Sequence, residues 1–292
     1  MTKHYFFIIN PVYRIKANSL EKEIISFFKS REDKYQIVFS KNLNNLSQLA
    51  KEAVHLKVDV VIACGGDGTV NKVGQILIGK KIKFGIVPIG SGNGLANHFQ
   101  IPKNYYRALK VIVKGVTKKM DVGRVDNRYF FSNIGFGIEA EFIRNYNFLN
   151  IHGLMGYFLS FFKSIFSFKS CVLEIVSENK KIMIIADVLM ILNANEQGYG
   201  ISLSRSPKID DGSFEVLIID KTNPIYFIYL TLLVLLGFSI KKKKKVRCLF
   251  MKDFKITSKK HYINMQIDGE FDFIMKNNIH IRVIPKGIDV LC

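Results

Sequence analysis

Cysteines are few in this sequence, and none stands in a metal-binding spacing. The chain has 292 residues and four cysteines, which are too far apart to form a Cys-x-x-Cys pair or a zinc-finger pattern. We therefore expect no structural zinc site and a reducing compartment. The cysteines are Cys64, Cys171, Cys248 and Cys292.

Long apolar segments are also scarce. The N-terminus "MTKHYFFIINP" has five apolar residues in a row before Asn10 and Pro11, which is too short for the core of a signal peptide and predicts a β-strand instead. The segment from Pro224 to Lys245 has about 16 apolar residues, fewer than the roughly 20 that cross a bilayer. We expect a buried or interfacial helix there, with a membrane span as the alternative.

Acidic residues are outnumbered, with 24 Asp plus Glu against 43 Lys plus Arg and a net charge of +19. Such a charge attracts nucleic acid, an anionic membrane or a polyphosphate, although an AT-rich genome would also encode this Lys-, Ile- and Asn-rich mixture. Each of the five lysines from Lys241 to Lys245 contributes about 1 kcal/mol of attraction near an anionic leaflet. We expect a cytoplasmic protein peripheral to the inner membrane and no nucleic-acid partner; a homodimer stays open.

The pattern of apolar residues predicts two domains. Over residues 1–120, strand-like runs without polar alternation are separated by helical segments, which indicates a parallel sheet covered on both faces. The first of these helices is expected to be capped by Asn18 or Ser19. From Asp121 on, strand runs joined by turn residues predict an antiparallel domain over residues 121–292. Its last residues are a candidate for a return to the first domain.

One helical segment, residues 148–168, is rich in phenylalanine. A surface of this kind usually belongs to the protein core, and this is the reading that we favour. The alternative is that the segment borders an apolar ligand site or a membrane interface.

Two glycine-rich loops follow predicted strands. In "VVIACGGDGTVNKV", the residues from Gly65 to Gly68 stand where a parallel strand passes to a helix, which is where open α/β sheets bind ligands. Glycines let the backbone approach a phosphate and present N–H groups, and the helix adds its positive end. Thr69 offers a hydroxyl, and Asp67 can bind magnesium or accept a proton.

The second loop, in "KFGIVPIGSGNGLANHF", repeats this design with Gly90, Ser91, Gly92, Asn93 and Gly94 before a short helix. If the two strands are neighbours, the loops form one cleft lined with donors for a polyphosphate. Neither loop is a Walker A motif or the GxGxxG of dinucleotide folds.

Together, "CGGDGTVNKV" and "VPIGSGNGLANHF" closely resemble the catalytic domain of the diacylglycerol kinase and sphingosine kinase superfamily, in particular its soluble bacterial lipid kinases. Three further segments resemble family landmarks in family order: "DVGRVDNRYFFSNIGFGIEAE", "PKIDDGSFEVLII" and "INMQIDGEF". The resemblance implies an α/β domain like that of diacylglycerol and NAD kinases, followed by an antiparallel β-sandwich domain.

The same resemblance implies a function that uses ATP and Mg²⁺. The expected reaction is phosphorylation of the hydroxyl of a membrane lipid, with diacylglycerol converted to phosphatidic acid. A kinase of sphingosine-type long-chain bases is the alternative, and a lipid-binding pseudokinase is the alternative from another class. NAD kinase is disfavoured by the "GSGNGLAN" loop.

Site residues also follow from the resemblance. Glu270 is the implied general base for the lipid hydroxyl, with Asp67 as a second catalytic residue, and Glu141 is a head-group candidate. Asp211 is the implied magnesium ligand, with Lys208 and Ser213 supplying main-chain oxygens. The implied nucleotide contacts are Asn10, Ser40, Gly65, Gly66, Asp67, Gly68, Thr69, Asn71, Gly90, Ser91 and Asn93.

Some positions depart from the family pattern or have an ordinary explanation. The first strand ends in "NPVYR" where relatives have NPxSG, so Arg14 or Lys16 would have to replace backbone donors, and weaker ATP binding is one consequence. Gly94 stands where many bacterial diacylglycerol kinases have Asp, which leaves the lipid open. From the residues alone, Asp211-Gly212 and Asp268-Gly269 are ordinary turns.

Overall fold

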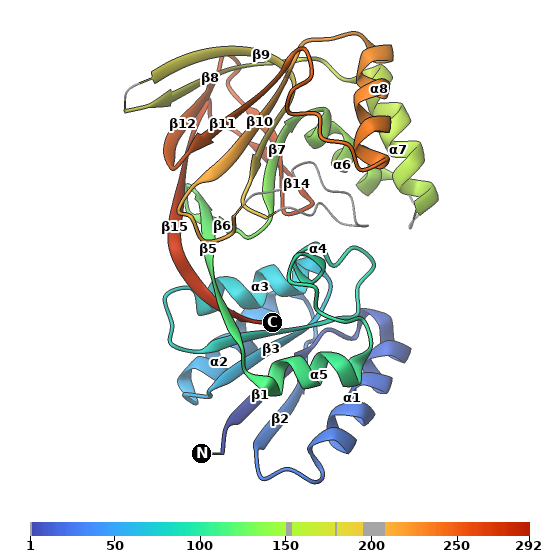
Figure 1. The fold of residues 1–292 in the computed structure, drawn as a ribbon, viewed down its shortest axis with the longest axis vertical. Coiled ribbons are helices and arrows are strands. Elements are labelled where there is room, and N and C mark those ends of the chain that lie inside the picture. Colours follow the sequence, from blue (N-terminus) through green and yellow to red (C-terminus); the bar gives the residue numbers. More distant parts are fainter. Residues whose placement is uncertain (1, 150–153, 179, 195–207) are drawn as a thin grey trace. The chain divides into compact units, whose positions relative to one another are not determined.

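The computed structural model describes residues 2–149, 154–178, 180–194 and 208–292, and these residues form two compact units (Figure 1). Unit 1 contains residues 2–122 and 285–292, and unit 2 contains the described residues from 123 to 284. Strands β5 (Thr117–Val125) and β15 (Asn278–Leu291) each have residues in both units.

Unit 1 alternates strands with helices in the order that the sequence predicts. Its strands are β1 (His4–Ile9), β2 (Lys34–Phe39), β3 (Val60–Gly65) and β4 (Lys83–Pro88). A 3₁₀ turn, η1 (Pro11–Tyr13), follows β1. The helices are α1 (Arg14–Phe28), α2 (Leu43–His55), α3 (Asp67–Leu77), α4 (Gly94–His98) and α5 (Tyr105–Lys114).

The sheet of unit 1 is parallel, in the order β4-β3-β1-β2. Helices α2 and α3 pack together on one side of it, and α1 packs with α5 on the other (Figure 1). Because both faces are covered, five consecutive residues of β1, from Tyr5 to Ile9, are all buried. This is why the strands read as unbroken apolar runs. The predicted α/β domain is confirmed.

Unit 2 is an antiparallel β-sandwich with three helices, which confirms the second half of the predicted fold. The helices are α6 (Ile138–Phe148), α7 (Leu154–Ser167) and α8 (Pro224–Leu235). The strands, beside parts of β5 and β15, are β6 (Arg128–Phe130), β7 (Asn133–Gly137), β8 (Cys171–Ser177), β9 (Lys180–Leu192), β10 (Phe214–Asp220), β11 (Val246–Met251), β12 (Asp253–Ser258), β13 (Ile263–Ile267) and β14 (Glu270–Ile274).

Strands β9 and β10 separate two hydrophobic cores within unit 2. Along β10, Val216 and Ile218 point into the core of the sandwich, while Leu217 and Ile219 point to a second core that holds side chains of α6, α7 and α8. Successive side chains of a strand point to opposite faces, so a strand with a core on each face must be apolar at every position. This explains the runs "VLMIL" in β9 and "VLII" in β10.

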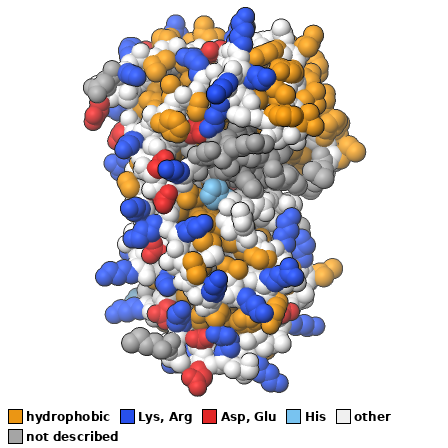
Figure 2. Space-filling view, viewed as in Figure 1, with side chains coloured by type: hydrophobic (Ala, Val, Ile, Leu, Met, Phe, Trp, Pro, Cys, Tyr) orange, Lys and Arg blue, Asp and Glu red, His pale blue; other side chains and the backbone are white. Residues whose placement is uncertain are grey.

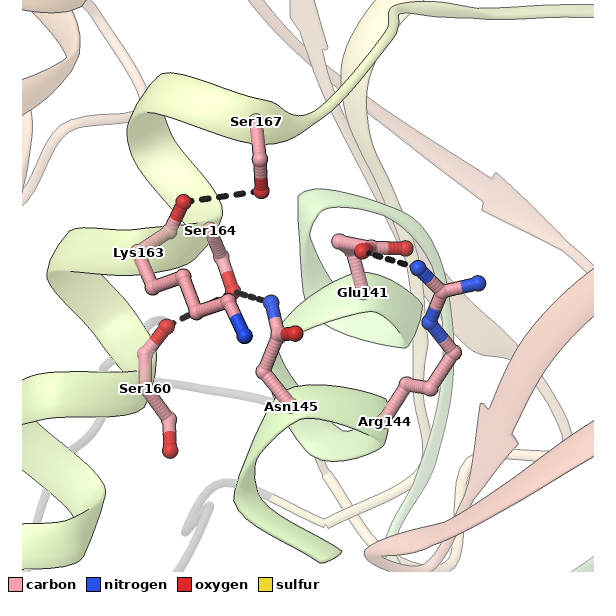
Figure 3. Close-up of polar contacts among 7 residues, drawn as sticks. All are labelled: Glu141, Arg144, Asn145, Ser160, Lys163, Ser164 and Ser167. Carbon is pink, nitrogen blue, oxygen red and sulfur yellow. Dashed lines mark hydrogen bonds and ion pairs between the residues drawn. The ribbon is translucent and has the colours of Figure 1, made fainter. Parts of the chain in front are cut away.

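Helix α7 packs two serines inward and leaves several of its phenylalanines outward. The Nδ2 group of Asn145 on α6 donates to the Ser164 hydroxyl at 2.8 Å, and both Ser160 and Ser164 are fully buried (Figure 3). By contrast, Phe158 and Phe166 are 60% and 72% exposed. The prediction that this segment is core is therefore wrong for these phenylalanines. Because Ser160 and Ser164 are small and lie on the same face of α7, α6 can pack closely against that face. Phe158 and Phe166 lie on the other side of the helix.

Helix α8 has 12 residues, so the Pro224 segment forms a helix shorter than its apolar run. None of the described helices has both the length and the apolar character that crossing a membrane requires. Phe227 and Leu230 of α8 are buried, whereas Leu232 and Leu235 are half exposed. Figure 2 shows hydrophobic side chains gathered on the surface over α7 and α8.

Candidate functional site

The two glycine loops of unit 1 meet at the carboxyl ends of β3 and β4. These strands are neighbours, with Gly65 opposite Pro88, and the N–H of Ile89 donates to the carbonyl of Gly65 at 3.2 Å. A Cβ added to Gly90 would lie 2.5 Å from the Cα of Gly66. No side chain fits at that distance, so the two loops contact each other backbone to backbone at Gly66 and Gly90.

Asp67 joins the two loops through hydrogen bonds. It begins α3, and its carboxylate accepts hydrogen bonds from the backbone N–H groups of Asn93, Gly94 and Leu95 at the start of α4. Burial raises the pKa of this carboxyl, and those N–H groups oppose the shift. The side chain that the sequence offers as a catalytic residue therefore also fixes the geometry of the second loop.

Two buried polar atoms near these loops have no hydrogen-bond partner among the described residues: Ser40 Oγ and Asn93 Oδ1. Ser40 directly follows β2 and is 3% exposed, and Asn93 is 4% exposed with a left-handed backbone (φ 55°). Leaving a buried polar atom unpaired costs about 1–3 kcal/mol, so such atoms point to a group that completes them. Both belong to the predicted nucleotide contacts.

The segment "NPVYR" after β1, which departs from the family pattern, forms a 3₁₀ turn and the start of a helix. Pro11 starts the turn η1, which runs directly into α1, so the helix begins at Arg14 and the prediction of a start near Asn18 is wrong. Proline at the first position favours such a start, and the Asn10 side chain accepts from the N–H of Val12. The loop therefore offers a helix N-terminus where relatives have a serine and a glycine.

Side chains around this turn connect it to both glycine loops. Asn10 Nδ2 donates to the Thr69 hydroxyl at 2.9 Å, and Lys16 Nζ donates to the carbonyl of Ile89 at 3.2 Å. Thr69 is buried and would collide with any Cβ at Gly65, 2.2 Å away. Of the other predicted contacts, Ser91 is exposed, and Gly66, Gly68, Asn71 and Gly90 are partly exposed.

In unit 2, Glu270 follows a two-residue turn and begins β14. Asp268 and Gly269 both have positive φ, 47° and 84°, as the tight hairpin turns that join twisted strands require. Glu270 is exposed, and no hydrogen bond or ion pair of its side chain is found among the described residues. Its carboxylate is available to a reactant.

The carboxylate of Asp268 fixes this turn to the connection between β6 and β7. It accepts backbone N–H groups from Phe131 at 2.8 Å, from Ser132 at 2.8 Å and from Asn133 at 3.0 Å. The N–H of Asp268 donates in return to the carbonyl of Asn133. The position of the turn before Glu270 is therefore fixed by charge-assisted bonds.

Buried amides complete this support, and the sequence reasoning missed them. Gln266 Oε1 accepts from the N–H of Gly269 at 2.9 Å, while its Nε2 donates to Asn133 Oδ1. Asn193, at the end of β9, donates to the carbonyl of Phe131 at 2.8 Å. All three amides are at most 4% exposed. The signal for them was the presence of amides within strands that are otherwise apolar.

The predicted metal turn contains two adjacent carboxylates, Asp210 and Asp211, and both are exposed. Asp211 Oδ1 accepts hydrogen bonds from the Ser213 N–H at 3.0 Å and from its hydroxyl at 2.9 Å. Asp211 and Lys208 are exposed and Ser213 is partly exposed. Over the described ranges of the chain, no three His, Cys, Asp or Glu side chains gather as a metal site would require. The segment "NEQGYGIS", residues 195–202, lies outside the described residues.

Glu141, the predicted head-group contact, lies on α6 and pairs with Arg144 at 2.6 Å (Figure 3). Its carboxylate is thus partly neutralised within its own helix. It lies in unit 2 with Glu270, whereas Asp67 and the glycine loops belong to unit 1.

Comparison with known proteins covers both units. Residues 4–125 match the model of the diacylglycerol kinase catalytic domain, and residues 132–292 match the YegS C-terminal NAD kinase β-sandwich-like domain. The diacylglycerol kinases of Staphylococcus aureus strains JH9 and Newman are 30% identical over 178 residues, which is 60% of this chain and 56% of theirs. The match thus spans a little over half the length of these curated relatives.

Solved structures show the same fold. A crystal structure of a diacylglycerol kinase from Bacillus anthracis str. Sterne covers 99% of this chain and 96% of its own, with a TM-score of 0.76 and 18% identity. A structure of a candidate diacylglycerol kinase from the same strain gives a TM-score of 0.82 at 19% identity, covering 99% and 97%. With both matched domains in order along it, the chain belongs to the diacylglycerol kinase-like family that joins this catalytic domain to a YegS-type β-sandwich.

Proposed function

We propose that this protein is an ATP- and Mg²⁺-dependent lipid kinase that phosphorylates the hydroxyl of a membrane lipid, with diacylglycerol as the leading acceptor. The observation that carries the proposal is the pair of unpaired buried atoms, Ser40 Oγ and Asn93 Oδ1, beside the glycine loops. The names of the relatives support the reaction class, and the match to little more than half of their length leaves the lipid to experiment.

The residues of unit 1 fit a nucleotide. The loops after β3 and β4 have glycines where a Cβ would collide with neighbouring atoms, and the N-termini of α1 and α3 follow strands of one sheet. Helix N-termini attract anions through their unpaired N–H groups. Ser40 and Asn93 would donate to or accept from the nucleotide, and Lys16 adds a positive charge near Ile89.

The fit to magnesium is simpler, because Mg²⁺ keeps several waters and takes one or two protein carboxylates. Asp211 offers one, with main-chain oxygens of Lys208 and Ser213 as further candidates. A bound Mg²⁺ neutralises charge on phosphate oxygens. Asp67 is the carboxylate of unit 1 proposed to assist, and its bonds to the start of α4 hold the second loop in position meanwhile.

Glu270 is the proposed general base. Phosphoryl transfer depends mostly on positioning and charge neutralisation, so one carboxylate near the acceptor hydroxyl is sufficient. Glu270 would take the proton of that hydroxyl at a carboxylate oxygen. Its exposure makes it reachable, and the Asp268 turn before it fixes where it stands.

A lipid substrate requires contact with a membrane, and α7 and α8 suit a peripheral one. Their outward side chains form a hydrophobic surface (Figure 2), and the lysines from Lys241 to Lys245 follow α8. Apolar area together with nearby lysines is typical of proteins that lie on an anionic leaflet. These features support the proposal that the protein acts at the inner membrane surface.

The test is transfer of label from radioactive ATP with Mg²⁺ into mixed micelles that contain diacylglycerol and sphingosine together. We expect labelled phosphatidic acid as the main product, and none with Glu270→Gln. Labelled sphingosine phosphate would reassign the acceptor. If no lipid is labelled although ATP with Mg²⁺ raises the melting temperature, the pseudokinase reading replaces the kinase. In a parallel reaction with NAD in place of lipid, labelled NADP would indicate the activity of the related NAD kinases instead.

A further inference from the structure

Unit 2 contains a pocket that the proposed nucleotide binding and proton transfer do not use, and Glu141 is the one predicted site residue that lines it. Its volume is about 430 Å³, and it lies between α6, the end of α7, the start of β8 and the turn from β12 to β13. The pocket reaches Asn264 near the start of β13, whereas Glu270 follows the other end of that strand. Asn264 lies three residues before Ile267, which pairs with Glu270, so at about 3.3 Å per residue the two are roughly 10 Å apart along the strand. Glu270 is not among the residues that line the pocket. The pocket is therefore a different site from the proposed base.

The lining of this pocket is strongly cationic. It includes Arg144, Lys169, Lys259 and Lys260 and a single acidic side chain, Glu141. Because Glu141 pairs with Arg144 at 2.6 Å, three lysines remain without a carboxylate of the lining to balance them. A concave surface lined by one sign of charge concentrates the field, so the pocket attracts a multiply charged anion.

Asn264 adds a second feature that points to a ligand. Its Oδ1 atom is buried and has no hydrogen-bond partner among the described residues. A buried acceptor of this kind is completed by a hydroxyl or N–H group. Lysines for an anion and an amide oxygen for a hydroxyl together match a phosphate ester that carries a hydroxyl group, such as a glycerophosphate.

Helix α7 connects the pocket to an apolar surface. Its outward rings, Phe158, Phe162 and Phe166, are four residues apart and so lie on one face of the helix. The helix ends at Ser167, and Ser167 and Phe168 line the pocket. A molecule that lies along this face with apolar chains would bring a charged head to the lysines.

We propose that this pocket binds the phosphate-bearing head group of an anionic glycerophospholipid, while the acyl chains lie in the membrane against α7. This lipid is not the acceptor of the kinase reaction, and its binding needs no nucleotide. It would hold unit 2 on membranes that contain phosphate diesters with free hydroxyls, and the proposal stands or falls separately from the kinase function.

The test uses the full chain without ATP and measures sedimentation with vesicles of phosphatidylcholine that contain 0 or 30% phosphatidylglycerol. We expect binding that depends on phosphatidylglycerol. The double variant Lys259→Gln/Lys260→Gln should bind roughly 20-fold more weakly, since each lysine contributes about fivefold near an anionic leaflet. In a competition experiment, soluble glycerol 3-phosphate is added to the protein bound to vesicles. Displacement of the protein would show that the head group alone is sufficient for binding.

The matched control is Lys80→Gln/Lys81→Gln, which removes two adjacent exposed lysines from a turn of unit 1. It loses the same charge, so we expect binding within about twofold of the wild type. Equal losses in the two double variants would show that only net charge matters and would overturn the pocket. So would binding to pure phosphatidylcholine at the same strength.

A second variant keeps the size and shape of the pocket. Asn264→Asp keeps Oδ1 and replaces the amide NH₂ group with a second oxygen. The resulting negative charge opposes an anionic ligand. We expect about fivefold weaker binding to phosphatidylglycerol vesicles, with an unchanged far-ultraviolet circular dichroism spectrum as the check on folding. Binding at wild-type strength in this variant would contradict the assignment of Asn264.

Discussion

The two units position their functional residues by opposite means. In unit 1, the loops after β3 and β4 are shaped by missing side chains, with Gly66 and Gly90 in backbone contact. In unit 2, the turn before Glu270 is shaped by added side chains, since Asp268, Gln266 and Asn133 form a network beneath it. A loop that must admit a phosphate cannot be filled, whereas a turn that must present one carboxylate is best supported from below.

The largest effect should come from Glu270, because it is held by the network without being part of it. We expect Glu270→Gln to lower kcat for lipid phosphorylation by roughly 10²- to 10⁴-fold, the range of general-base contributions. The side chain is exposed, so the melting temperature should stay within about 1 °C. A variant that loses activity only in proportion to lost folded protein would remove Glu270 from its proposed role.

Substitution of Asp268 should lower the stability of unit 2, whereas substitution of Glu270 should lower activity without loss of stability. Asp268→Ala leaves three N–H groups without their acceptor, and we expect a loss of about 3 kcal/mol in the free energy of unfolding. Asp268→Asn keeps one carbonyl oxygen and should lose about half as much. Hydrogen exchange followed by mass spectrometry should show faster exchange in β13 and β14 and none in β3. Faster exchange in both units would contradict the statement that Asp268 supports the turn of unit 2 alone.

Gly90 tests whether unit 1 depends on empty space. A Cβ at Gly90 would meet the Cα of Gly66 at 2.5 Å, so Gly90→Ala should cost about 2 kcal/mol of stability and at least roughly tenfold in ATP affinity, because the backbone must move. Gly79→Ala is the control. Gly79 has φ 72° and no atom within 4 Å of an added Cβ, so it should cost about 1 kcal/mol through strain alone. Calorimetric titration with ATP should find this control unchanged in affinity.

Glu139 provides the smallest effect and a dependence on pH. It lines an apolar cavity of about 110 Å³ with Phe142 and Phe227, and the loss of hydration raises its pKa to about 7. A carboxyl with a raised folded-state pKa stabilises the fold fully below its unfolded pKa, near 4.5, and that contribution is lost as pH rises through about 7. Glu139→Gln should therefore be about 1–2 kcal/mol more stable than the wild type at pH 8 and equal to it at pH 4. Urea denaturation across this range measures the difference, and parallel pH profiles would contradict it.

The sequence predicted the loops of unit 1 well because the causes are local. Strand, glycines and helix follow one another within a few residues, so the pattern shows both the sheet edge and the accessible backbone. The support of Glu270 could not be predicted in this way, since Asp268 meets partners that are 135 to 137 positions away. The proposed contacts of Ser91, Asn71 and Lys208 stay predictions.

The error on residues 148–168 has a related cause. Phenylalanine indicates core in most proteins, but the face of α7 that packs inward was decided by Asn145, whose amide pairs with Ser164. This partner lies on a neighbouring helix, so the composition of the α7 segment alone does not reveal the pairing. The number of aromatic residues was therefore less informative than the spacing of Ser160 and Ser164.

Strand β15 has a consequence for how the protein is made. Its end belongs to unit 1, where Lys286 donates its N–H to Asp121, 165 positions earlier, and Val290 lies beside Phe84 of β4. On the ribosome, unit 1 emerges long before this strand exists, so the edge of its sheet stays open while all of unit 2 is synthesised. An open edge can pair with another chain. Nascent chains of this protein should therefore depend on chaperones until the final strand arrives, and cuts that remove residues 285–292 should harm the unit that was translated first.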